Sequence, residues 1–368
     1  MNTDTPSTAT SSTATSSTDL PAAQGFAMPA EWSEHAATWT SWPFDDALWV
    51  GHLEGVRREL AELVTTIARF EPVVVNVRDE ETEEDARSRL TAAGADMTRI
   101  RFHRLALNDI WFRDNGPLFV RDEQGQVALT DWVFNAWGEK YRPWDDDDRA
   151  PKRVAETLGM RRFAVDKVME GGALELNSQG TLLTTRSCLL HQRRNPNLSE
   201  LDLERLLKGY LGAKHVIWLE GGLEDDHTDG HIDTIVRFAG DETILCSVEE
   251  DQKDANYDSM QRNLHALRAL RDGAGEPYRV VPLPLPQKRM ELSGKRLPLS
   301  YANFYIGNCF GVVPVYGYAN YERALAILRP LFPGRLVIGL NAAELITGGG
   351  AFHCVTQQQP AGEVYGGG

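Results

Sequence analysis

The sequence lacks long apolar runs, an excess of basic residues and any signal-peptide pattern at its start. No stretch approaches the roughly 18 uninterrupted apolar residues of a transmembrane helix. The formal net charge of −15 would repel the phosphates of a nucleic acid, whereas it suits a cationic small molecule. We therefore expect a soluble cytoplasmic protein that binds neither membranes nor nucleic acids.

Cysteine is scarce, and the four cysteines are unpaired in sequence: Cys188, Cys246, Cys309 and Cys354. They form no C-x-x-C pair, so neither a zinc ribbon nor a disulfide framework is predicted. Cys188, Cys246 and Cys309 are each expected to be a small buried structural side chain, and the first two lie in apolar runs. Cys354 closely follows the glycines at 348–350, whose flexible backbone can pass close to a bound group. It is the candidate nucleophile.

The chain divides into two parts by composition. Residues 1–25 are mainly Ser, Thr and Ala with few bulky apolar side chains, so we expect a disordered tail. Residues 26–368 have the apolar content of a folded domain. A unit of strand, tight turn and strand recurs there, with amphipathic helices between the copies, at Trp111–Thr130, Gly172–Thr185, Gly230–Val248 and Tyr301–Val315. This spacing favours one closed α/β domain built from repeats, in which distant segments share one site.

Three polar clusters accompany these units. Asp114 follows Arg113 in an apolar stretch, where a carboxylate must pair with a cation; an ion pair with Arg113 explains it equally well. Glu170 precedes two glycines, but the tripeptide is repeated at 220–222 and is not specific. His231 and Asp233 would share one face of an extended segment, which pairs a proton carrier with a carboxylate.

Two kinds of chemistry fit these residues. A metal-dependent hydrolase would use the segment His227–Asp233, where His227, Asp229, His231 and Asp233 are all plausible zinc ligands. Alternatively, several carboxylates beside a nucleophilic thiol suit a delocalised cation, because the N–H groups of a guanidinium match carboxylate geometry. The second interpretation predicts a guanidine or amidine substrate.

The combination of these motifs resembles a known family. Arg113-Asp114-x-Gly116-Pro117, Glu170 with its two glycines, Gly230-His231-x-Asp233 and the run from Gly348 to Cys354 are similar to the guanidino-group-modifying (pentein) superfamily. Within it, the chain resembles the agmatine deiminase and bacterial peptidylarginine deiminase-like family. That resemblance implies a five-bladed α/β propeller of ββαβ-type repeats, and it suggests a homodimer.

The resemblance also implies roles for the matching positions. Cys354 would be the nucleophile and His231 the general acid and base, while Glu170 would position His231 or a substrate nitrogen. Asp114 and Asp233 would hold the guanidinium. The implied reaction converts agmatine to N-carbamoylputrescine and ammonia with no metal or cofactor. Deimination of free or peptide-bound arginine is the alternative.

No motif in the sequence identifies the residues that would bind the distal end of the substrate. Asn115 and Ala351 stand where typical agmatine deiminases have other residues. An acidic side chain such as Glu224, Asp225 or Asp226 could meet a second ammonium group of the substrate.

Overall fold

The computed structural model describes residues 17–366, which form a mixed α/β fold. Within this range, five sheets share one pattern: an antiparallel strand pair is followed by a third strand parallel to its second member. The sheets are β18 (Thr356–Pro360), β1 (His35–Ser41), β2 (Val73–Val77) and β3 (Ile100–Arg104); β4 (Leu118–Arg121), β5 (Gln126–Val133) and β6 (Arg162–Val168); β7 (Glu175–Leu176), β8 (Thr181–Thr185) and β9 (His215–Leu219); β10 (Val236–Phe238), β11 (Thr243–Val248) and β12 (Arg279–Pro284); and β15 (Tyr305–Gly307), β16 (Phe310–Val315) and β17 (Leu336–Asn341).

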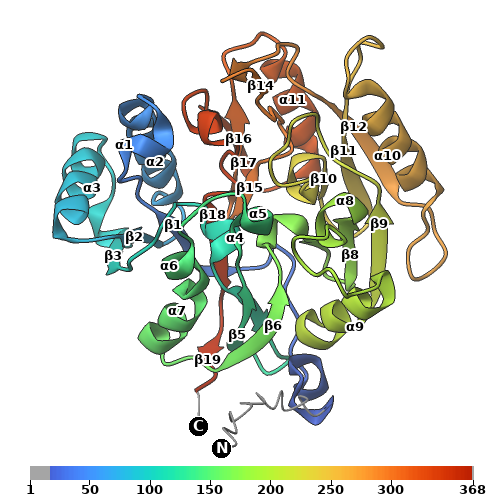
Figure 1. Cartoon of the computed structure of the whole chain (residues 1–368), viewed down its shortest axis with the longest axis horizontal. Coiled ribbons are helices and arrows are strands. Elements are labelled where there is room, and N and C mark those ends of the chain that lie inside the picture. Colours follow the sequence, from blue (N-terminus) through green and yellow to red (C-terminus); the bar gives the residue numbers. More distant parts are fainter. Residues whose placement is uncertain (1–16, 367–368) are drawn as a thin grey trace, which may run out of the picture.

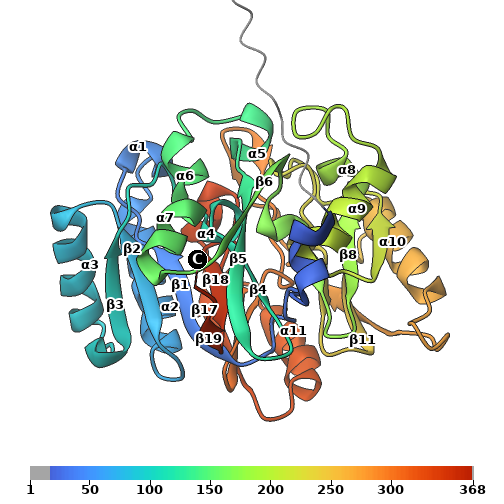
Figure 2. The same cartoon turned by 90° about the horizontal axis from the view of Figure 1, so that it is seen from below.

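A helix connects each parallel pair, because parallel neighbours need a crossover. These helices are α2 (Leu53–Ile67), α7 (Ala150–Leu158), α9 (Glu200–Leu211), α10 (Tyr257–Ala269) and α11 (Tyr321–Leu328). With α3 (Glu80–Ala92), they lie towards the outside, and the sheets lie further in (Figure 1). From below, α3 and α10 are on opposite sides of the molecule (Figure 2).

A strand near the start of the chain and a strand near its end pair in one sheet. Strand β18 pairs with β1, so a C-terminal segment completes the first sheet. The short strand β19 (Glu363–Val364) adds parallel to β5, and a separate hairpin comprises β13 (Glu291–Leu292) and β14 (Lys295–Arg296). No helix in residues 17–366 is long and apolar enough to cross a membrane.

The second strands and the helices follow the sequence prediction closely. Ser199 caps α9: its hydroxyl accepts from the Asp202 backbone N–H, and the Asp202 carboxylate accepts from the Ser199 backbone N–H, which forms a capping box. Order at the N-terminus begins earlier than the predicted boundary at residue 25, since 3-10 turns form at Ser17–Asp19 (η1) and Pro21–Gln24 (η2). Pro21 is buried and Leu20 packs against an apolar cluster, which stabilises this segment. The rest of the predicted tail, residues 1–16, lies outside the described residues.

The first strands of the units differ from the prediction. The segment containing Asp114 is a short helix, α4 (Phe112–Asn115), before β4. Two 3-10 turns, η4 (Gly171–Ala173) and η5 (Ile232–Thr234), stand before β7 and β10. The premise that His231 and Asp233 share a face of an extended strand is therefore wrong. Tight turns place these polar side chains in the interior just before each strand begins.

Candidate active site

The structure brings together all five side chains that the sequence singled out. Asp114 comes from α4, Glu170 immediately precedes η4, and Cys354 follows the turn η7 (Leu345–Gly348). The ring of His231 has its Nδ1 atom 3.8 Å from Asp114 Oδ1 and its Nε2 atom 3.6 Å from Glu170 Oε2. Cys354 Sγ is 3.7 Å from Asp233 Oδ2. All five are buried, so segments up to 240 positions apart meet in one interior site.

Gly172 lies at the centre of this group. Its backbone N–H donates to Asp114 Oδ1 at 2.9 Å. A Cβ atom on Gly172 would be 2.5 Å from His231 Nδ1, 2.8 Å from Asp114 Oδ1 and 3.1 Å from Asp233 Oδ2. Gly172 is therefore enclosed by two carboxylates and an imidazole, and a side chain at this position would collide with them.

Several polar atoms in this cluster have no hydrogen-bond partner among the described residues. Both ring nitrogens of His231 and the Oδ1 atom of Asp233 are buried and have no hydrogen-bond partner among residues 17–366. Buried polar atoms are nearly always satisfied, so unpaired ones call for a ligand or water. A planar cation with several N–H groups would supply donors to the two carboxylates.

The thiol of Cys354 lies in an environment that disfavours its ionisation. Burial raises its pKa well above the usual value, and the negative charges of Asp233 and Asp114 raise it further. Asn303 Nδ2 donates to Sγ at 3.2 Å. Nothing in the sequence around Asn303 indicated this contact with the thiol. A cation bound to the carboxylates would favour the thiolate.

In contrast to the thiol, His231 and Glu170 lie in surroundings that favour the ionised form of each side chain. Burial would lower the pKa of His231, but Asp114 and the other acidic groups around it hold that pKa well above its usual value. Glu170 is buried, which raises its pKa, yet Arg194 and His231 lower it to about 2. Arg194 Nε lies 2.8 Å from both carboxylate oxygens of Glu170. The resting site thus combines a protonated imidazole with an ionised glutamate.

Asp233 is held by a chain of hydrogen bonds to residues that were not predicted from the sequence. Its Oδ2 atom is 2.7 Å from His353 Nδ1, and His353 Nε2 is 2.8 Å from Glu31 Oε2. Arg237 donates to the same Glu31 oxygen at 2.6 Å. His353 was visible only as part of a motif, and Glu31 lies 322 positions away with no motif of its own. These contacts occupy Asp233 Oδ2, while its Oδ1 atom has no partner among residues 17–366.

An aromatic cavity of about 270 Å³ adjoins the site. Trp137 is in its lining, and the Trp137 Nε1–H donates to Asp114 Oδ2 at 2.9 Å. Asp109 is the acidic member of the lining, and burial raises its pKa to about 6. Its other lining residues include Trp49, Trp111, Tyr141 and His227. We call this the outer cavity.

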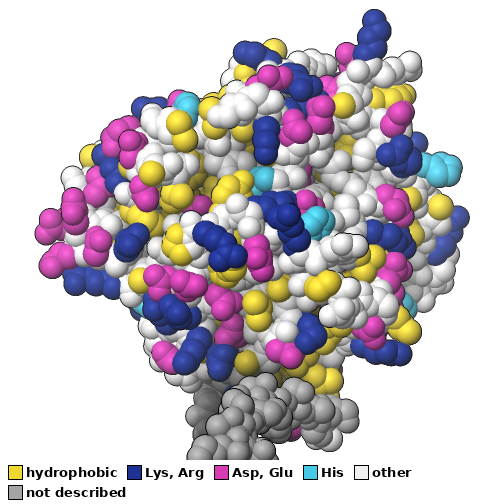
Figure 3. Space-filling view, viewed as in Figure 1, with side chains coloured by type: hydrophobic (Ala, Val, Ile, Leu, Met, Phe, Trp, Pro, Cys, Tyr) yellow, Lys and Arg dark blue, Asp and Glu magenta, His cyan; other side chains and the backbone are white. Residues whose placement is uncertain are grey.

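The acidic residues suggested for the substrate's distal end have other contacts. Glu224 pairs with Arg289 and Arg296, and Asp225 accepts from the Arg296 backbone. None of Glu224, Asp225 and Asp226 lines the outer cavity. Asp109 does, and it was missed because an isolated aspartate in a loop carries no sequence signal. Acidic and basic side chains are interspersed on the face of the molecule in Figure 3.

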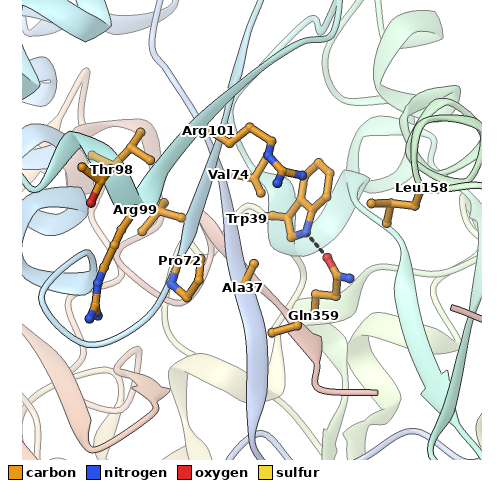
Figure 4. Close-up of a pocket in the computed structure, with 12 residues that line it drawn as sticks. Ala37, Trp39, Pro72, Val74, Thr98, Arg99, Arg101, Leu158 and Gln359 are labelled. Atoms are coloured by element: carbon orange, nitrogen blue, oxygen red, sulfur yellow. Dashed lines mark hydrogen bonds between the residues drawn. The ribbon is translucent and has the colours of Figure 1, made fainter. Parts of the chain in front are cut away.

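A separate hollow of about 550 Å³ lies away from these residues. Trp39, Val74, Arg99, Arg101 and Gln359 are in its lining, and the Trp39 indole donates to Gln359 (Figure 4). It contains none of the predicted site residues. The cluster around Gly172 and the outer cavity therefore form the candidate active site.

Comparison with known proteins is consistent with this geometry. Residues 27–360 match the profile of the Porphyromonas-type peptidyl-arginine deiminase family. The chain belongs to this family. It is 38% identical to an agmatine deiminase of Pseudomonas aeruginosa over 366 residues, which cover 94% of this chain and 98% of that protein.

Solved structures of similar proteins have the same fold. The agmatine deiminase of Enterococcus faecalis superimposes with a TM-score of 0.87 at 32% identity. The match covers 93% of the present chain and 98% of the E. faecalis chain. An agmatine deiminase of C. jejuni with substrate bound gives a TM-score of 0.83 at 29% identity, covering 92% and 97% of the two chains. An amidinotransferase from Microseira wollei, at 11% identity and a TM-score of 0.52, shares the fold alone.

The ligand set of the alternative zinc hydrolase is wrong. Asp229 is bound by Lys140 and Arg194, while His227 lines the outer cavity. Only His231 and Asp233 of that segment face the site. Among the described residues, the one group with metal-binding geometry consists instead of Glu170, Cys188 and His231.

Proposed function

We propose that this chain is an agmatine deiminase, which hydrolyses agmatine to N-carbamoylputrescine and ammonia. The observation that carries the proposal is the buried cluster of Asp114, Asp233 and His231 around Gly172, with the Cys354 thiol 3.7 Å from Asp233. Its charge suits a guanidinium group, because carboxylates accept hydrogen bonds from the planar N–H donors of that group. Two similar proteins are named agmatine deiminases, and agmatine carries a guanidinium group.

Substrate binding prepares the nucleophile. The guanidinium neutralises Asp114 and Asp233, the two carboxylates that raise the pKa of the Cys354 thiol. With the substrate in place, Cys354 releases its proton to solvent and its thiolate attacks the guanidinium carbon. Hydrogen bonds to the carboxylates localise charge on the nitrogens and make that carbon a better electrophile.

His231 moves the protons. As an imidazolium it donates a proton to the departing ammonia, which leaves an S-alkylthiouronium on Cys354. The neutral imidazole then takes a proton from water, whose attack on the same carbon releases the ureido product and the thiolate. Glu170 holds His231 through its charge, 3.6 Å from Nε2, and Arg194 keeps Glu170 ionised.

The outer cavity favours agmatine over arginine. Its aromatic walls suit a methylene chain, and Asp109 would meet a distal ammonium, being ionised above about pH 6. A free arginine would also bring a carboxylate close to Asp109, which is unfavourable. Residues 26–368 form a single deiminase domain in this proposal, the five sheets are the blades of a propeller, and the enzyme is a cytoplasmic homodimer.

The test is ammonia release from purified protein supplied in parallel with agmatine, arginine and an arginine-containing peptide, with and without EDTA. We expect turnover of agmatine with little effect of EDTA and a kcat/KM for arginine at least about a hundredfold lower. Preferential turnover of arginine or the peptide would refute the substrate assignment. Activity that EDTA abolishes would refute the metal-independent mechanism.

A further inference from the structure

A buried thiol that the proposed reaction does not use lies behind the active site. Cys188 comes from α8 (Arg186–Leu189), and its Sγ atom is 3.7 Å from Glu170 Oε2. The same oxygen is 3.6 Å from His231 Nε2. The three donor atoms lie within 4.8 Å of one another, and all three residues are buried.

The two separations of 3.7 and 3.6 Å are close to those in the coordination shell of zinc. With Zn–S near 2.3 Å and Zn–N or Zn–O near 2.0–2.1 Å, the edges of a tetrahedron measure roughly 3.4–3.6 Å. Sulfur, imidazole and carboxylate are also the donors that zinc prefers in proteins. Three protein ligands with an open fourth position could therefore form without large movement of any side chain.

Two further observations point to a ligand at this position. The Nε2 atom of His231 is buried and has no partner in the described part of the chain. A thiolate and Glu170 would together offset the charge of a divalent cation, and Asp114 lies 3.8 Å from the other ring nitrogen. The opposing charge is Arg194, which donates to Glu170 and is itself offset by Asp229 at 2.7 Å.

We propose that Glu170, Cys188 and His231 bind a thiophilic divalent cation such as Zn²⁺, and that this ion inhibits the enzyme. Binding replaces the Cys188 S–H bond with an S–Zn bond and the Nε2–H bond of the His231 imidazolium with an N–Zn bond. Both protons are released to solvent, with no change in oxidation state. The ion would occupy Nε2 of His231 and a Glu170 oxygen. Inhibition rests on the proposed deiminase function, whereas binding does not.

The binding test uses Co²⁺, which gives a sulfur-to-metal charge-transfer absorption only when a thiolate coordinates it. The starting protein carries Cys354→Ser and Cys309→Ser, which removes the active-site thiol and the thiol of Cys309, which is exposed and not buried as predicted. We expect the absorption in this protein and its loss when Cys188→Ser or Cys188→Ala is added. Thermal unfolding of each variant checks that it is folded.

Two results of the Co²⁺ titration would overturn the site: no charge-transfer absorption in the starting protein, or absorption that persists without Cys188. The first needs no Cys188 variant, so misfolding of that variant cannot hide the answer. Neither result depends on enzymatic activity, so a failure of the deiminase assignment is seen separately.

The inhibition test compares the Zn²⁺ concentration that halves agmatine turnover in the wild type and in Cys188→Ser, each relative to its own rate without zinc. We expect the variant to need at least about tenfold more Zn²⁺, the scale on which metal sites respond to loss of a supporting group. Equal sensitivity would show that zinc inhibits elsewhere, for example at Cys354, and would overturn the inhibitory role.

Discussion

At the scale of single residues, the absence of a side chain at position 172 is as important as the groups around it. Replacement of Gly172 by Ala should place a methyl group 2.5 Å from His231 Nδ1, beside the proposed guanidinium site. This contact is too short, so the side chains of the site must shift. Because small displacements of reacting groups are costly, we expect kcat/KM for agmatine to fall at least about a hundredfold. Steady-state kinetics measure the loss.

The sequence offers a matched control in its second Glu-Gly-Gly tripeptide. A Cβ atom at Gly221 would meet only the Ser187 hydroxyl at 3.7 Å, which is ordinary contact. Gly221→Ala should therefore retain activity, and both variants should have far-UV circular dichroism like that of the wild type. Normal kinetics in Gly172→Ala would show that the guanidinium does not bind beside this residue.

Sequence reasoning identified the residues that carry recognisable chemistry and missed those that act through contact. Asp114, Glu170, His231, Asp233 and Cys354 were predicted because each stands in a motif. Asn303 and Arg194 touch these groups only after folding, and Glu31 supports Asp233 through His353. Nothing in the sequence around these three residues indicates it. Their contribution could not be predicted from the pattern of one sequence.

At the scale of elements, the turn α6 (Asp145–Asp148) holds the loop that bears Asp109. Asp147 Oδ1 accepts hydrogen bonds from the backbone N–H groups of Asn108 at 2.7 Å and Asp109 at 3.3 Å. Burial, with a smaller effect of the Asp109 charge, raises the pKa of Asp147 to about 8. The folded protein therefore keeps a proton that the unfolded chain releases near pH 4.

This difference predicts a pH dependence of stability. As pH rises from about 4 to about 8, the unfolded chain binds fewer protons than the folded one at Asp147, so the free energy of unfolding falls. Asp147→Asn keeps an oxygen acceptor and cannot ionise. Its stability relative to the wild type should rise by at least about 1 kcal/mol between pH 4.5 and pH 8.5.

Chemical denaturation of both proteins at the two pH values measures this difference. Asp145→Asn, which removes an exposed carboxylate from the same turn, is the control and should show no comparable change. A relative stability of Asp147→Asn that is constant with pH would mean that Asp147 does not retain its proton in the folded protein.

The elements themselves were partly predictable. Apolar periodicity and capping residues located the helices and the second strand of each unit, because these features are local. The short helix and 3-10 turns that carry Asp114, Gly172 and Asp233 were read as strands. Their backbone is determined by packing of buried polar groups against distant segments, which a local pattern does not record.

At the scale of the whole molecule, the site depends on repetition. The same strand order recurs in five sheets, and the turns before β4, β7 and β10 deliver Asp114, Gly172 and Asp233 to one interior region. The repeating units suggested this convergence in advance. What repetition could not predict is the closure of the first sheet by β18, which anchors the segment just after Cys354.

The central claim is that Cys354 attacks the guanidinium carbon, and mass spectrometry of enzyme quenched in acid during agmatine turnover tests it most directly. We predict a peptide containing Cys354 that is heavier by the mass of agmatine less ammonia, and no such adduct in Cys354→Ser. An adduct on Cys188, or turnover by Cys354→Ser with no adduct on any residue, would contradict the account.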